Sequence, residues 1–209
     1  PATEHEDKGT ETDANQDAQL YYHRLGTPQA EDILVVDSDP VTRSSMWHCD
    51  VTDDGQWLIL ANSKDTDNKM RYYAASLADG VSSRMAWIPI SSDFAFMLDY
   101  IANDNTRFYM LSNKDAPNYR IVSFELDPTK ARVVDHVSQL TGGISSFTDI
   151  VPEDPQAILT TAAVLDHNKL LSVYSRDVKD ELWVFDLTTG DRITRLLPCL
   201  LYTSDAADE

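Results

Sequence analysis

Hydrophobic and polar residues alternate with a period close to two along most of the chain, the pattern of strands that bury one face. These apolar segments are rich in β-branched and aromatic residues, and short polar turns separate them. No segment carries a sustained 3.6-residue apolar stripe, so the pattern predicts an all-β chain with few helices. The clearest predicted strands are 20–25, 32–36, 56–61, 69–76, 95–101, 107–112, 119–126, 169–175, 181–187 and 192–198.

A repeat underlies these strands. An aromatic strand that ends in leucine and a turn occurs four times, at Leu25, Leu77, Leu126 and Leu187. A polar turn followed by an apolar strand precedes each of the last three by about twenty residues. The spacing of the leucines sets the length of the repeat unit, and a four-stranded unit of roughly 40–50 residues is typical of a β-propeller blade. The alternative is a β-sandwich whose strands have this spacing by accident.

The repeat predicts an incomplete β-propeller of about three and a half four-stranded blades. The predicted parts are an acidic connecting segment at 1–19, a half blade at 20–36, and blades at 46–90, 94–140 and 144–197. The third unit is longer, and we assign its insertion to the solvated loop at 151–157. A blade buries both faces against neighbours, so an open arc of blades predicts a piece of a larger protein.

The composition narrows the function. The 209 residues contain 17 Lys and Arg against 35 Asp and Glu, a formal charge of −18. Such a charge disfavours nucleic acid and anionic membranes as partners. There is no apolar run long enough for a membrane helix, and the acidic N-terminus does not resemble a signal peptide. The few cysteines and the lack of an Asn-x-Ser/Thr site favour the cytoplasm.

Three segments also carry a family resemblance. Residues 9–35 ("GTETDANQDAQLYYHRLGTPQAEDILV"), 112–128 ("SNKDAPNYRIVSFELDP") and 174–191 ("YSRDVKDELWVFDLTTGD") are similar, in order and spacing, to the prolyl oligopeptidase propeller. The resemblance implies a seven-bladed ring joined to an α/β-hydrolase domain of the same chain with a Ser-Asp-His triad. Such cytosolic serine peptidases of the prolyl oligopeptidase family cleave short peptides after proline, and their propeller restricts access to the active site.

The sequence itself carries no catalytic motif. No glycines frame a serine as Gly-x-Ser-x-Gly, and "GGISS" (142–146) is interpreted as a loop between blades. His48 and Cys49 are adjacent, so a strand would point them to opposite faces, and we expect Cys49 to be a small buried residue. There is no zinc motif, and "DTDNK" (65–69) lacks the glycine and glutamate of a calcium loop. We therefore predict no catalytic residue, metal or cofactor in this chain.

One loop is predicted to face substrate. The resemblance implies that the loop at 61–69 reaches the active-site cavity of the complete enzyme, with an arginine and a cysteine or threonine in the family. Here Ser63 stands at the arginine position and Thr66 at the cysteine or threonine position, with Lys64 beside them. The missing arginine puts the usual contact to the peptide backbone in doubt, and we expect Thr66 to line the cavity.

The last eleven residues have a different origin in our interpretation. Residues 199–209 ("CLLYTSDAADE") match no strand period and read as a translated sequencing adapter. The native part is then expected to end near Pro198, with Cys49 as its one cysteine.

We expect the chain to be a propeller fragment of a peptidase that cleaves after proline, inactive by itself. The alternatives are a propeller that only binds ligands, and a related peptidase of other specificity, such as one that cleaves after basic residues.

Overall fold

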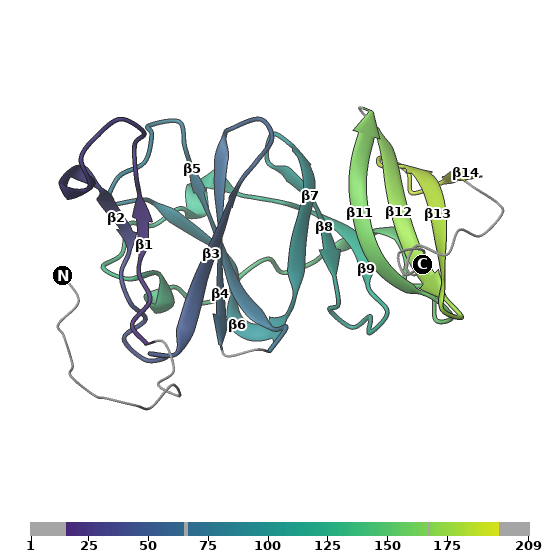
Figure 1. Ribbon diagram of the computed structural model, residues 1–209, viewed down its shortest axis with the longest axis horizontal. Coiled ribbons are helices and arrows are strands. Elements are labelled where there is room, and N and C mark those ends of the chain that lie inside the picture. The colour runs from purple at the N-terminus through teal and green to yellow at the C-terminus, as the bar shows by residue number, and fades with distance from the viewer. Residues whose placement is uncertain (1–15, 65–66, 167, 197–209) are drawn as a thin grey trace, which may run out of the picture.

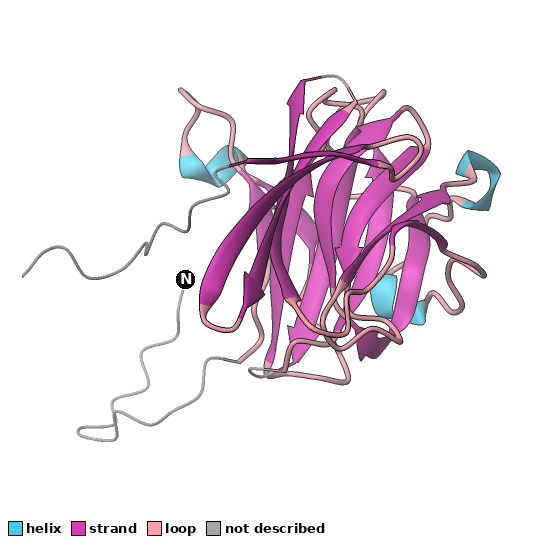
Figure 2. Ribbon diagram, turned by 90° about the vertical axis from the view of Figure 1, so that its right-hand side faces the viewer, coloured by secondary structure: helices cyan, strands magenta, loops and turns pink. Residues whose placement is uncertain are grey.

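The computed structural model describes residues 16–64, 67–166 and 168–196, which form antiparallel sheets in a row (Figure 1). Seen along the row, the sheets stack face to face (Figure 2). The first sheet has two strands, β1 (Leu20–Tyr22) and β2 (Ile33–Val36), over the range predicted as a half blade. Short 3₁₀ turns are η1 (Gln29–Glu31), η2 (Pro128–Lys130) and η3 (Val137–Gln139).

Three four-stranded sheets follow, each formed by strands that are consecutive in the chain. The second sheet contains β3 (Ser45–Val51), β4 (Trp57–Lys64), β5 (Met70–Ser76) and β6 (Trp87–Phe96). The third contains β7 (Leu98–Asp104), β8 (Arg107–Ser112), β9 (Arg120–Glu125) and β10 (Thr148–Val151). The fourth contains β11 (Ile158–Asp166), β12 (Lys169–Arg176), β13 (Lys179–Asp186) and β14 (Arg192–Leu196).

Apolar side chains fill the space between successive sheets, so an inner sheet buries apolar residues on both of its faces. Leu60 and Tyr73 belong to the core between the first and second sheets. Phe108, fully buried, lies between the second and third, with ring centroids 5.7 Å from Phe124 and 6.1 Å from Trp57. A third core joins the third and fourth sheets. Burial of one such aromatic ring contributes roughly 4–6 kcal/mol of gross transfer free energy.

Two predicted boundaries differ from the structure. The strand predicted at 95–101 is two strands of different sheets, because the chain leaves β6 and enters β7 at Met97, whose N–H donates to Asn113 Oδ1 at 2.7 Å. The strand β10 lies in the range predicted for the last blade but pairs with β9. The segment predicted as an insertion, 151–157, connects the third and fourth sheets, and its Ala157 is buried, so it is not wholly solvated.

Two glycines bring each later sheet against the outer strand of the sheet before it. A Cβ on Gly143 would lie 2.4 Å from the carbonyl oxygen of Ile90 in β6, and one on Gly190 would lie 1.8 Å from that of Ile150 in β10. Residues 142–144 also bond to β6 through Ser92 N–H to Gly142 O and Ile144 N–H to Ile90 O. The predicted loop at 142–146 thus covers a sheet edge that would otherwise offer unpaired backbone groups.

Among the described residues, no further sheet packs on the far face of the fourth sheet. Leu171, Val173, Leu182 and Val184 are on the face opposite the core residues Leu170 and Phe185 by strand alternation. None of the three apolar cores formed by the described residues includes this face. This face is therefore where an open arc of blades ends.

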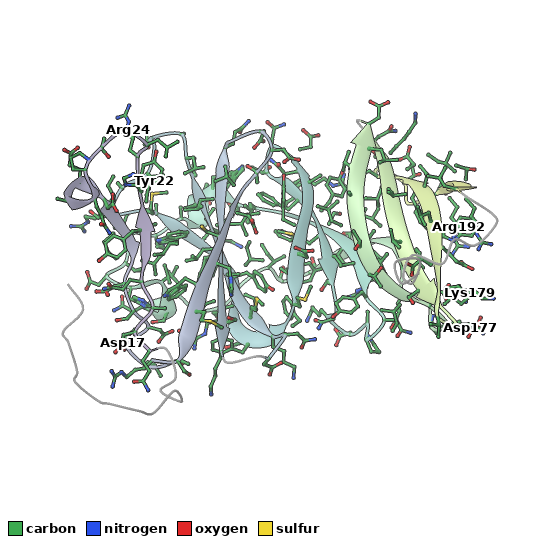
Figure 3. The ribbon with its side chains drawn as sticks, in the orientation of Figure 1. Asp17, Tyr22, Arg24, Asp177, Lys179 and Arg192 are labelled. Atoms are coloured by element: carbon green, nitrogen blue, oxygen red, sulfur yellow. The ribbon has the colours of Figure 1, made fainter. Side chains whose placement is uncertain are left out.

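A stability prediction arises at the turn between β12 and β13. Val178 has φ 63° and is 95% exposed, and Asp177 and Lys179 flank it at the end of the sheet (Figure 3). The left-handed conformation costs a residue with a Cβ about 1–2 kcal/mol. Glycine avoids this cost but loses more conformational entropy on folding, so Val178→Gly is expected to raise the free energy of unfolding by about 0.5–1 kcal/mol.

Urea denaturation measures this change. Val41→Gly is the control, because Val41 is 80% exposed and has no positive φ. The control should lose stability, and equal losses in both variants would show that the Val178 turn is not strained.

Candidate substrate-facing site

The predicted substrate-facing loop is the connection between β4 and β5. In Figure 1 the end of β4 at Lys64 lies at the same lower edge as the β8–β9 and β12–β13 connections. Thr66 lies outside the described residues, so its predicted position at the cavity stays a prediction. Lys64, the last residue of β4, is exposed. Of the three predicted residues, the structure therefore presents Lys64 at the surface.

Ser63 lies inside the molecule. It is 3% exposed, and its Oγ is 3.2 Å from Nε2 of His48 on the neighbouring strand β3. A serine next to a histidine is the start of a nucleophilic pair, but a buried hydroxyl does not reach a peptide bond. The contact between Ser63 and His48 therefore links β3 to β4, and its role is structural.

The sequence interpretation did not single out Arg71 on β5. Its Nη1 donates to Asp39 Oδ2 at 2.9 Å, and its guanidinium lies 4.3 Å from the ring centroid of Phe94. The Asp39 side chain is fully buried, and its Oδ1 accepts the N–H groups of Val41 and Thr42. The arginine is therefore held at the base of the hairpin. An arginine inside the otherwise apolar strand "MRYYAAS" was the signal available in the sequence.

A recess of about 200 Å³ opens between the second and third sheets, next to this hairpin. Its inner wall is apolar and includes Tyr72 and Met110, which are almost fully buried. Its mouth carries His48 and Asp50 from β3 and Asp99 from β7. The recess is large enough for one side chain, and its carboxylates favour a neutral or cationic group.

At the mouth of the recess, the surroundings of Asp99 change the pKa of its carboxyl group. Asp99 is reached by water, but protein surrounds it on the inner side. This desolvation, and then the negative charge of Asp50, raise the pKa of Asp99 above its ordinary 3.8, while the Tyr100 N–H lowers it. Burial also raises the pKa of the Tyr100 hydroxyl on the same strand. The mouth of the recess thus retains a proton more readily than an isolated aspartate.

We predict a pH-dependent gain in stability from Asp99→Asn. A raised folded-state pKa means that the folded chain loses stability as pH rises through that pKa, and that the loss is absent below 3.8. The variant should therefore be more stable than the wild type at neutral pH, and the difference should shrink as the pH falls towards 3.8. Urea midpoints at several pH values measure it, with the exposed Asp104→Asn on the same strand as control. A difference independent of pH would contradict the assignment.

Cys49 is not the buried residue that was expected. It is exposed on β3, which is the first strand of its sheet, and no described strand pairs with the other edge of β3. Partial burial and then Asp50 raise the pKa of its thiol, so it is not an activated nucleophile. His48 faces the recess and its neighbour Cys49 faces the other side of the sheet, as strand alternation requires.

The described part of the chain offers neither a metal centre nor a membrane-spanning helix. Residues 16–64, 67–166 and 168–196 contain no group of three or more His, Cys, Asp or Glu side chains placed to hold a metal ion. Within the same ranges, no helix has the length and apolarity needed to cross a membrane.

The stacked four-stranded meanders, joined through apolar cores and open at one end, define an arc of a β-propeller. The family model described as the prolyl oligopeptidase N-terminal β-propeller domain matches residues 2–207 of this chain. The chain belongs to this family. The match includes residues 199–207, so it does not separate that segment from the rest, and the adapter origin of 199–209 stays a prediction.

Curated relatives agree with this assignment. Prolyl oligopeptidase A of Amanita bisporigera is 34% identical over 189 residues, which are 90% of this chain and 23% of that protein. The dual function macrocyclase-peptidase POPB of Galerina marginata is 30% identical over 199 residues, 95% of this chain and 25% of that protein. The chain spans about a quarter of the length of these relatives.

Solved structures show the same relation. Prolyl oligopeptidase B from Galerina marginata, bound to a 35mer hydrolysis and macrocyclization substrate, matches with a TM-score of 0.80 and 29% identity. The match covers 95% of this chain and 25% of that one. Its apo form matches with a TM-score of 0.77 and 28% identity, covering 90% and 24%. The chain is thus an N-terminal propeller portion of the prolyl oligopeptidase type.

Proposed function

We propose that this chain is the gating part of a serine-type prolyl oligopeptidase that cleaves short peptides after proline. The observation that carries the proposal is the family match over residues 2–207 together with the TM-score of 0.80 to a peptidase bound to its peptide substrate. The proposed partner is an α/β-hydrolase domain of the same polypeptide, which supplies the Ser-Asp-His triad. The propeller limits substrates to peptides that pass it.

The recess and the exposed Lys64 support a role for the β4–β5 hairpin in contacting peptide. Lys64 offers a cation to peptide carbonyl groups, and the recess beside the hairpin accepts one side chain. The acidic mouth formed by Asp50 and Asp99 favours peptides with a neutral or basic residue there. The Asp50 and Asp99 carboxylates also support the alternative specificity, which is cleavage after basic residues.

Activity assays test the proposal. The 209-residue chain and the longer polypeptide that contains it are compared on fluorogenic peptides with proline or arginine at the cleaved position. We expect cleavage after proline by the longer polypeptide only, and its loss with a serine-directed inhibitor. Cleavage after arginine would select the related peptidase. Peptide binding without cleavage by the longer polypeptide would select a binding propeller.

We also propose that the protein acts in the cytoplasm. The absence of a disulfide framework in the sequence supports this location. Fractionation of the source cells with an antibody against the chain tests it, and recovery in the secreted fraction would contradict it.

A further inference from the structure

The recess between the second and third sheets combines an apolar interior with an acidic mouth. Its volume is about 200 Å³, and eleven residues line it, most of them on β3, β4, β5, β7 and β8. In the interior, Ile59, Tyr72 and Met110 are each at most 5% exposed. At the mouth, Asp50 and Asp99 are open to water. A ligand that fits both parts has an apolar stem and a polar end.

The register of the strands places the acidic and apolar groups on one face of the second sheet. Asp50 on β3 is directly opposite Ile59 on β4. On the next row, Ala61 on β4 is opposite Tyr72 on β5. Ile59 and Ala61 are two residues apart on one strand, so both rows share the face that lines the recess. Because β3 is the first strand of this sheet, the Asp50 carboxylate stands at the open edge of an apolar surface.

No cation of the described part of the chain neutralises the mouth. None of the lining residues is Lys or Arg, and neither Asp50 nor Asp99 forms an ion pair with a described residue. Burial, and then the charge of Asp50, raise the pKa of the Asp99 carboxyl group. Burial, and then the charge of Asp99, raise the pKa of the Tyr72 hydroxyl, against the Leu98 N–H. A positive charge at the mouth would therefore relieve repulsion between the two carboxylates.

A long basic side chain meets both requirements. The aliphatic stem of lysine or arginine packs against apolar surface while its charged end remains in a polar place. A metal ion does not meet them, because the described residues contain no group of three side chains able to hold one. We propose that the recess binds a lysine or arginine side chain of the substrate peptide, with its stem against Tyr72 and Met110 and its charge at Asp50 and Asp99.

The recess is placed to meet a peptide inside the ring. Of the described strands that belong to different sheets, β7 and β11 have the most extensive backbone contact, and each is the first strand of its sheet. Propeller blades surround a central channel, so the first strands lie nearest to it, and the recess opens between two of them, β3 and β7. The inference rests on the proposed function in one respect, that the basic group arrives within a peptide. The carbonyl group that is attacked must reach the triad of the other domain, so the residue in the recess is not the cleaved proline.

Peptide binding to the longer polypeptide tests the inference. The probes are fluorescent peptides of equal length with one proline and otherwise neutral residues, in which lysine is moved through the other positions. Each is paired with a peptide that has norleucine at the same position, which keeps the stem and removes the charge. A serine-directed inhibitor prevents cleavage, and fluorescence anisotropy gives Kd. At one position, lysine should bind about tenfold more tightly than norleucine.

Substitution of the carboxylates assigns this preference to the recess. In the double variant Asp50→Asn with Asp99→Asn, lysine and norleucine peptides should bind equally, because the amides keep the shape of the mouth and remove its charge. Asp104→Asn is the matched control, since it removes a negative charge from the same strand, β7, at a residue that does not line the recess. This control should keep the full preference for lysine.

The outcomes separate the recess from the peptidase. A lysine preference that is equal at all positions, or that survives in the double variant, would overturn the inference, because a formal charge of −18 attracts cations without a site. Equal binding of lysine and norleucine peptides at every position would overturn it as well. Cleavage after proline without inhibitor tests the proposed function separately. Cleavage without a lysine preference contradicts the recess alone, and a lysine preference without cleavage supports the recess and contradicts the peptidase.

Discussion

Gly190→Ala is expected to destabilise the chain by about 3–5 kcal/mol, combining a left-handed backbone penalty with a collision in a packed contact. Gly190 has φ 76°, and a Cβ there would lie 1.8 Å from the Ile150 carbonyl oxygen and 2.9 Å from its carbon. These atoms are backbone of β10, so relief requires the third and fourth sheets to separate. The free energy of unfolding by urea denaturation, with an unchanged m value, measures the loss.

Gly80→Ala isolates the contact from the backbone conformation. Gly80 has the same φ of 76° but nothing within 4 Å of its Cβ position. Its loss should be about 1–2 kcal/mol, the cost of the conformation alone. Equal losses at the two positions would show that the fourth sheet does not rest on β10 at Gly190.

Asp39→Ala is expected to cost about 3–5 kcal/mol, since it leaves the Arg71 guanidinium without its partner in a largely buried place. The Asp39 side chain is fully buried and that of Arg71 is 17% exposed. The substitution also removes the acceptor of two backbone N–H groups in the turn between β2 and β3. The same urea measurement applies.

Asp17→Ala is the matched control for this ion pair. Asp17 pairs with Arg43, and both side chains are well exposed. Solvent and salt screen such a pair, so its removal should leave the urea midpoint unchanged. A similar loss in both variants would mean that burial does not set the strength of the Asp39–Arg71 pair.

The class of fold was predictable because its signal is local and repeated. Alternating segments such as 107–112 and 119–126 become β8 and β9 with almost the same bounds. The edges of the sheets were not predictable in this way. β3 carries polar residues on a largely exposed strand, and the break at Met97 depends on the Asn113 side chain sixteen residues later.

The candidate site was predictable only in part. Family resemblance located the β4–β5 connection, and Lys64 is exposed there. Position along a loop did not reveal that Ser63 turns inward to His48, because that depends on the register of β3 against β4. The Asp39–Arg71 pair joins residues 32 positions apart, and no local pattern encodes such a contact.

The central claim is that residues 20–196 are consecutive blades of a larger ring. A crystal or cryo-electron microscopy structure of the longer polypeptide tests it most directly. We predict that β3–β6, β7–β10 and β11–β14 keep their order around an axis, and that a further sheet covers Leu171, Val173, Leu182 and Val184. A longer polypeptide in which that face contacts only solvent, or in which these sheets close on themselves, would contradict the claim.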